Sequence, residues 1–125
     1  DDDRRSLANM IWRNTKSNKI IVTHGTDTMI ETAQFVSNAA GAAAPDKVVV
    51  FTGAMKPQKM TDSDAGFNVG AAVGAMNFLA AGVYVCMGGR IFEASRVTRN
   101  EVSGLFIPKE STSAQVARSK TQDSA

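Results

Sequence analysis

The sequence predicts an α/β fold, a Rossmann-like three-layer sandwich with a largely parallel sheet. Three short runs rich in β-branched apolar residues, at 19–23, 48–51 and 83–87, alternate with segments of helical character. The runs are apolar with little interruption, which is typical of strands that are buried on both faces, as parallel strands are. Alternation of such strands with helices is the pattern of βαβ units. A chain of 125 residues with a hydrophobic fraction of 43% has enough apolar residues for one globular domain.

Each expected element has a local reason. The acids at the N-terminus favour a helix from about residue 2 to 16, because carboxylates stabilise helix N-termini. Pro45 ends the helical segment that follows the first strand, and Gly88 and Gly89 form a hairpin turn. The further elements are expected at 28–40 (helix), 65–80 (helix) and 90–92 (strand), followed by an extended arm at 95–108. One domain therefore spans 1–108, and 109–125, rich in Ser, Thr, Gln and Ala, is predicted to be a flexible tail.

Composition narrows the possible functions. The net charge is only +2 and no basic stripe is present, so we expect no nucleic-acid partner. No apolar run reaches the length of a bilayer span and no signal peptide is visible, which predicts no membrane association and a cytoplasmic location. Cys86 stands alone in a buried run, so an intramolecular disulfide is impossible. One cysteine and one histidine are too few for a zinc site built from this chain, and we expect no metal and no cofactor.

A polar pentapeptide, His-Gly-Thr-Asp-Thr at 24–28, joins the first strand to the next helix. Ligands of open α/β sheets bind at the carboxyl ends of the strands, and a helix N-terminus offers unpaired N–H groups to an anion. Gly25 allows a sharp turn. Thr26, Asp27 and Thr28 are also ordinary N-cap residues, so the pentapeptide fits either a binding site or a capped turn.

The long loop at 52–64 leads into the next helix, and loops of this length in a compact domain are more often functional than not. Asp62 and Asp64 are either carboxylates of a site or caps of the following helix. For Asn68, in the first turn of that helix, we expect a structural role.

Three motifs in order resemble the bacterial-type L-asparaginase/glutaminase family: HGTDT at 24–28, VVVFTGAMKP at 48–57 and SDAGFN at 63–68. The resemblance covers about residues 1–98 and is closest to short, single-domain asparaginase-like proteins. It implies the fold of the asparaginase N-terminal domain. It also implies hydrolysis of the side-chain amide of L-asparagine, or of a similar small amide, to a carboxylate and ammonia through a threonine nucleophile.

The resemblance also assigns residues. Thr26 would be the catalytic threonine beside the substrate amide, and Asp27 would hold the α-ammonium group and orient the partner of the threonine. The implied substrate-binding residues are Gly25, Thr26, Asp27, Thr52, Gly53 and Ala54. The expected partner is a small amide. We also expect a homo-oligomer, because the Gly/Ala-rich segment at 65–80 allows close helix approach and Leu105-Phe106-Ile107 is apolar.

Two departures from the family pattern stand out. A Gly-Gly-Thr-Ile motif, which ends the first strand of the family, has no match here, so that strand is expected before Asp1 and the domain is expected to be truncated at its N-terminus. The lysine that activates the threonine is expected on the helix after Asp64, and counting without gaps places Leu79 there. Leucine cannot accept a proton, and Lys56 or Lys59 are the candidate substitutes.

Three functions therefore remain open at this point. The first is an asparaginase-like amidohydrolase. The second is a non-catalytic amino-acid-binding or regulatory domain of the same fold, which the missing lysine favours. The third is a subunit of a tRNA-dependent amidotransferase, against which the near-neutral charge argues.

Overall fold

The computed structural model describes residues 2–14, 16–41, 46–56 and 62–109. Its elements follow the predicted order as far as the fourth strand. They are α1 (Asp2–Arg13), β1 (Lys19–Thr23), α2 (Met29–Ala39), β2 (Val48–Thr52), α3 (Ala65–Met76), β3 (Gly82–Met87), β4 (Arg90–Glu93), the 3₁₀ turn η1 (Ala94–Arg96), β5 (Val97–Arg99) and β6 (Phe106–Pro108). The helix predicted at 65–80 ends earlier, at Met76, and the predicted extended arm folds into a β5–β6 hairpin.

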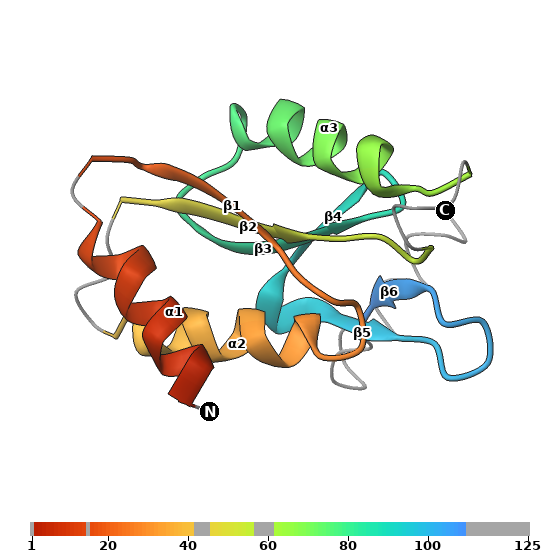
Figure 1. Cartoon of the computed structure of the whole chain (residues 1–125), viewed down its shortest axis with the longest axis horizontal. Helices are drawn as coiled ribbons and strands as arrows, with labels where there is room; N and C mark the ends of the chain where they lie inside the picture. Colours follow the sequence, from red (N-terminus) through yellow and green to blue (C-terminus); the bar gives the residue numbers. More distant parts are fainter. Residues whose placement is uncertain (1, 15, 42–45, 57–61, 110–125) are drawn as a thin grey trace, which may run out of the picture.

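The main sheet has four strands in the order β1-β2-β3-β4. The first three run parallel and β4 returns antiparallel to β3. In Figure 1 α3 covers one face of this sheet, and α1 and α2 cover the other. The predicted three-layer α/β sandwich with a largely parallel sheet is therefore confirmed. Within the described residues β1 is an edge strand, paired with β2 on one side only.

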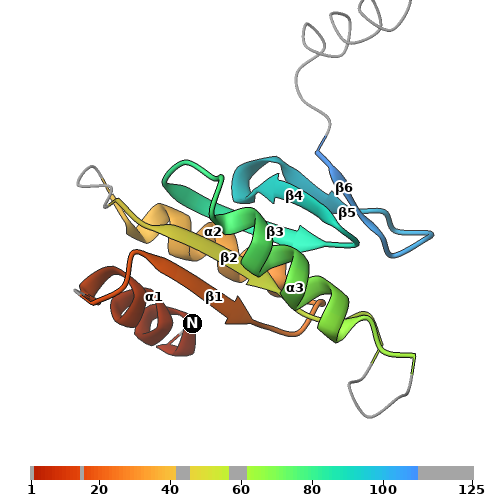
Figure 2. The ribbon, with the colours of Figure 1, turned by 90° about the horizontal axis from the view of Figure 1, so that it is seen from above.

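The two crossovers of this sheet have opposite hands. α2 joins β1 to β2 and packs on one face, whereas α3 joins β2 to β3 and packs on the other. Since β1, β2 and β3 stand side by side in chain order, helices on opposite faces require one right-handed and one left-handed connection. Nearly all such crossovers are right-handed. Figure 2 shows that the β2-α3-β3 connection is the left-handed one.

The core has two layers, and β2 belongs to both. All five of its residues are buried. Val49 and Phe51 pack toward α1 and α2, while Val48 and Val50 pack toward α3. A strand with apolar side chains on both faces is the expected consequence of a run that does not alternate with polar residues. Each such side chain contributes roughly 1.5–3 kcal/mol by leaving water.

The β5–β6 hairpin is part of the folded body. Val97 and Phe106 are buried and belong to the core on the α1–α2 side. The N–H group of Lys109 still donates to the carbonyl of Arg96. Residues 110–125, where the flexible tail is predicted, lie outside the described residues, and the tail stays a prediction. In the part of the chain that the structure describes, no helix is long and apolar enough to cross a bilayer.

Candidate functional site

A cleft of ≈ 530 Å³ opens at the carboxyl ends of β1 and β2. It is lined by Thr23, His24, Gly25, Gly53, Ala54, Ala65, Gly66 and Val69. The cleft lies where the chain leaves β1 toward one face of the sheet and leaves β2 toward the other. Ligands of open α/β sheets bind at such a switch point. The topology therefore places a ligand cleft beside the two loops that the sequence singled out.

The floor of this cleft depends on Gly53. The N–H of His24 donates to the carbonyl of Thr52 over 2.9 Å, which keeps the ends of β1 and β2 together. A Cβ atom at position 53 would stand 2.3 Å from the carbonyl oxygen of His24 and 3.0 Å from Cε of Met29. Glycine at this position is what allows the two strand ends to close on each other.

The turn at 24–28 is not accounted for by cap chemistry. Thr28 is the N-cap residue of α2, yet its side chain makes no capping hydrogen bond. The Nδ1 atom of His24 lies 2.7 Å from the carbonyl oxygen of Gly25, so the ring is folded back onto its own turn. Asp27 points into solvent, with 98% of its side chain exposed. The alternative of a plain capped turn thus loses its main support, and polar groups of the turn are left for a ligand.

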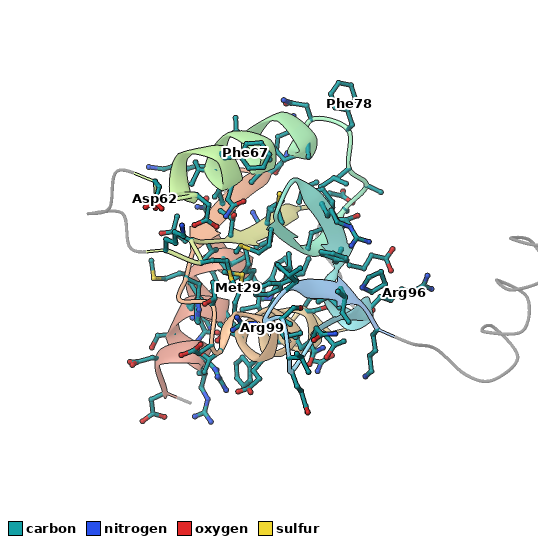
Figure 3. All side chains as sticks on the ribbon, turned by 90° about the vertical axis from the view of Figure 1, so that its right-hand side faces the viewer. Met29, Asp62, Phe67, Phe78, Arg96 and Arg99 are labelled. Atoms are coloured by element: carbon teal, nitrogen blue, oxygen red, sulfur yellow. The ribbon has the colours of Figure 1, made fainter. Side chains whose placement is uncertain are left out.

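Arg99 of β5 fastens the hairpin to this turn. Figure 3 labels Arg99 in a view toward the carboxyl ends of the parallel strands. Its Nη1 group lies 3.3 Å from the carbonyl oxygen of Thr26 and 3.4 Å from Oδ1 of Asp27. Its Nε group donates to the carbonyl of Gly104 over 3.0 Å. The guanidinium carbon lies 5.1 Å from the centre of the Phe106 ring, a cation–π distance. The side chain is 27% exposed. Arg99 is the cation of the described residues that contacts the candidate catalytic turn.

Sequence reasoning missed Arg99, and it placed the activating position at Leu79. That placement is wrong. Leu79 follows α3 and precedes β3, so it lies at the opposite end of the parallel sheet from Thr26, and it packs against the core on the α3 side. Arg99 comes 72 residues after Asp27, so no local pattern in the sequence connects the two residues.

Lys56 and Lys59 are the candidate substitutes for the activating lysine, and the structure describes only Lys56. The Nζ group of Lys56 lies 2.6 Å from Oδ2 of Asp62, so this lysine is engaged in an exposed ion pair on the loop. Lys59 falls outside the described residues.

The six implied substrate-binding residues fall into three groups. Gly25, Gly53 and Ala54 line the cleft. Thr26 and Asp27 lie on the turn that continues from its wall. Thr52 is fully buried, and its hydroxyl donates to the carbonyl of Cys86 over 2.7 Å, which ties β2 to β3. The hydroxyl of Thr52 is therefore engaged in a hydrogen bond within the sheet.

Asp64 and Asn68 organise the opposite wall. The carboxylate of Asp64 accepts hydrogen bonds from the N–H groups of Met55 and Lys56, each over 3.0 Å. Burial raises the pKa of this carboxyl, but the hydrogen bonds from Met55, Lys56, its own backbone and Asn68 outweigh burial and hold the pKa below the usual 3.8. Asp64 makes no side-chain cap bond to α3, so it holds the preceding loop instead.

Asn68 joins three segments at the same place. Its side chain is fully buried, and its amide N–H groups donate to the carbonyl of Gly53 over 2.8 Å and to Asp64 over 2.9 Å. Its amide oxygen accepts from the N–H of Gly88 over 3.1 Å. The expected structural role of Asn68 is thereby confirmed.

In the described part of the chain, no three His, Cys, Asp or Glu side chains lie close enough together to bind a metal ion. The cleft presents small side chains and bare backbone. Thr26 and Asp27 follow directly after Gly25 of its wall, and Arg99 contacts both of them. Such a set suits a small polar ligand that carries both a positive and a negative group.

Comparisons with known proteins agree on one family. A family model described as asparaginase, N-terminal, matches residues 2–123. A glutaminase-asparaginase from Acinetobacter glutaminasificans is 35% identical over 105 residues, which are 79% of this chain and 31% of that protein. A subunit of a glutamyl-tRNA(Gln) amidotransferase from Methanococcus vannielii is 39% identical over 72 residues, which are 58% of this chain and 16% of that protein.

Among solved structures, a probable cytoplasmic L-asparaginase from Campylobacter jejuni superposes with a TM-score of 0.74 at 32% identity. The match covers 86% of this chain and 35% of that one. The chain thus spans about a third or less of the length of the relatives that it matches.

Proposed function

Because this chain belongs to the asparaginase family, we propose that it acts as an asparaginase-like amidohydrolase on the side-chain amide of L-asparagine or a similar small amide. The observation that carries the proposal is the Thr26–Asp27 turn, which stands beside the cleft at the carboxyl ends of β1 and β2 and is held there by Arg99. A nucleophile candidate and a carboxylate thus follow directly after the wall of the cleft, and a cation contacts their turn.

In the proposed reaction the hydroxyl of Thr26 attacks the carbonyl carbon of the side-chain amide, and its proton goes to a base. The base passes this proton to the amide nitrogen as the C–N bond breaks, so the nitrogen leaves as ammonia and an acyl ester remains on Thr26. Water then hydrolyses the ester, which releases the carboxylate product and restores the hydroxyl. A threonine hydroxyl is a weak nucleophile at its free pKa, so the first step requires that base.

Arg99 has a different role in this proposal. A guanidinium keeps its proton at any working pH, so Arg99 does not accept the proton of Thr26. It holds the turn through the carbonyl of Thr26 and steers the carboxylate of Asp27. Because Asp27 is almost fully exposed, this ion pair adds little to stability. The carboxylate is free to meet the α-ammonium group of a substrate, and small residues such as Gly25 and Gly53 let the ligand approach the backbone.

The test is ammonia release from asparagine and glutamine by the protein and by its Thr26→Ala and Thr28→Ala variants. Thr28 is a matched control, since it is an exposed threonine of the same turn whose side chain makes no capping bond. We expect release to be lost in Thr26→Ala and kept in Thr28→Ala. Equal release by Thr26→Ala and the parent would refute the threonine chemistry.

Arg99 also motivates the second candidate, a non-catalytic domain that binds an amino acid. A cleft whose nearest cation cannot serve as a base fits binding without turnover. Calorimetry with asparagine and aspartate separates the two functions: binding without ammonia release supports the second, and ammonia release supports the first.

A third role follows from the relative in Methanococcus vannielii, which is part of an amidotransferase. Co-purification of the protein with a partner subunit or tRNA would support that role. The main proposal includes a small amide as the partner and a cytoplasmic location, as described for the similar Campylobacter jejuni protein.

A further inference from the structure

A second pocket, of ≈ 280 Å³, opens where β6 meets the end of β3 and the loop after β2. We call it the β6 pocket, because Phe106 and Ile107 of β6 line it. It shares no lining residue with the cleft at the ends of β1 and β2. The side chain of Asn68 lies between the two, since it donates to the carbonyl of Gly53 in the cleft and accepts from the N–H of Gly88 in the pocket. The β6 pocket is therefore a separate site.

The lining of the β6 pocket is mainly apolar. Its apolar side chains are Met55, Met87, Leu105, Phe106 and Ile107. Met55 is 40% exposed and Leu105 59%, so the pocket presents apolar surface to water. A concave apolar surface with a few polar groups is the usual form of a small-molecule site, and drug-sized sites measure roughly 300–1,000 Å³. The volume of the β6 pocket suits a molecule somewhat smaller than that.

Two charged residues, Asp64 and Arg90, complete the lining. The carboxylate of Asp64 already accepts three hydrogen bonds, from two backbone N–H groups and from the amide of Asn68. The guanidinium of Arg90 lies over the ring of Phe92, 5.0 Å from its centre. Among the described residues, no carboxylate forms an ion pair with Arg90. Because a guanidinium binds a carboxylate through two parallel hydrogen bonds, the pocket offers an unused anion-binding group beside apolar surface.

We propose that the β6 pocket binds a small carboxylic acid with an apolar body, in its anionic form. The carboxylate pairs with the guanidinium of Arg90, and the aliphatic or aromatic body lies against Met87, Leu105 and Ile107. The negative charge of Asp64 repels the carboxylate and so directs that end of the ligand toward Arg90. A ligand without an ammonium group differs from the doubly charged ligand that suits the cleft. The site does not depend on the proposed amide hydrolysis.

Arg99 connects the β6 pocket to the candidate catalytic turn. Its Nη2 group lies 3.8 Å from Sδ of Met55, and its guanidinium carbon lies 5.1 Å from the centre of the Phe106 ring. Both residues line the pocket. The same guanidinium contacts Thr26 and Asp27. A ligand that packs against Met55 and Phe106 therefore restrains Arg99, and the turn should respond to its binding.

The first measurement is the binding of hexanoate to the full chain by calorimetry. A ligand of about eight non-hydrogen atoms should bind saturably, with a Kd of roughly 1 mM. The probe 1-hexanol has the same body without the charge and should bind at least about tenfold more weakly. Hexylamine carries the opposite charge and should also bind more weakly than hexanoate, because Asp64 is already hydrogen-bonded and Arg90 repels a cation.

Variants test which side chains hold the ligand. Arg90→Gln should weaken hexanoate binding at least about tenfold and leave 1-hexanol binding unchanged, because it removes the charge and keeps a polar side chain. Arg96→Gln is the matched control and should bind like the parent. Arg96 lies outside the pocket, pairs with Glu93 over 3.3 Å and is 77% exposed. Figure 3 shows its side chain at the outer edge of the molecule.

A second pair of variants tests the apolar body of the ligand. Leu105→Ser should weaken the binding of both hexanoate and 1-hexanol. Val102→Ser is its control, because Val102 is 98% exposed on the β5–β6 connection and does not line the pocket. The four substituted side chains are exposed, so circular dichroism should stay that of the parent in every variant.

The second measurement locates hexanoate by NMR, from the backbone amide signals of the full chain. The signals of Gly88 and Ile107, which line the pocket, should shift on titration. Those of Thr26 and Asp27 should shift with them, because Arg99 contacts both the pocket lining and the turn. The signal of Val69, which lines the cleft alone, should stay in place.

Several results would overturn the proposal. Absence of saturable hexanoate binding well above millimolar concentration would show that the pocket does not take such an anion. Unchanged affinity in Arg90→Gln, or tighter binding of hexylamine than of hexanoate, would exclude Arg90 as the anion-binding group. A shift at Val69 without one at Gly88 would place the ligand in the cleft, and shifts that spare Thr26 and Asp27 would refute the link through Arg99. Ammonia release enters none of these readouts, so they fail or succeed separately from the proposed hydrolysis.

Discussion

Replacing Gly53 by alanine should destabilise the protein more than any conservative change in the lining of the cleft. The added Cβ would lie 2.3 Å from the carbonyl oxygen of His24, where real contacts of this kind stay beyond about 3.0 Å. The ends of β1 and β2 must therefore separate by about 0.7 Å. Overpacking of this kind costs roughly 1–3 kcal/mol.

Two hydrogen bonds are strained by the same shift. They are the bond from His24 to the carbonyl of Thr52 and the bond from Asn68 to the carbonyl of Gly53 itself. Each contributes about 1 kcal/mol, so we expect Gly53→Ala to lower the free energy of unfolding by about 2–4 kcal/mol in total. For a domain of this size that corresponds to a fall in Tm of about 10–20 °C.

The assay is urea unfolding followed by circular dichroism, with Gly25→Ala as the matched control. Both glycines line the same cleft and neither has a positive φ, but a Cβ at position 25 meets nothing within 4 Å. The control should keep the stability of the parent or exceed it by up to about 1 kcal/mol. Equal unfolding midpoints for Gly53→Ala and the parent would refute the steric argument.

The remaining predictions concern the same end of the sheet. Asn68→Ala should cost about 3 kcal/mol in urea unfolding, because it leaves buried partners in three segments unpaired, while Asn9→Ala, an exposed change in α1, should be neutral. Thr52→Val should cost about 1 kcal/mol by removing the buried bond to β3; an unchanged midpoint would argue against that bond. The pKa of Asp64 is lower in the folded than in the unfolded state, so its contribution to stability is full above about pH 5 and is lost as pH falls through the folded pKa. Acid titration of stability should therefore be shallower in Asp64→Asn than in the parent.

The order of elements and the end of the sheet that carries the site could be predicted from the sequence. Uninterrupted apolar runs indicate parallel, doubly buried strands, and parallel strands bring their carboxyl ends to one edge. That rule was enough to place Gly25 and Gly53 in one cleft, since each directly follows a strand or its turn. Such signals are local, because backbone propensity and side-chain periodicity act over a few residues.

Only the tertiary structure decided which side chains meet at that edge. Three features depend on how whole elements pack. They are the left-handed β2-α3-β3 connection, the burial of the Thr52 hydroxyl toward β3, and the position of Leu79 at the far end of the sheet. Arg99 reaches Thr26 and Asp27 because the hairpin of β5 and β6 anchors Phe106 in the core. Contacts between residues more than seventy positions apart leave no signal of periodicity or propensity in the sequence. The cation of the candidate site can therefore be identified only in the folded structure.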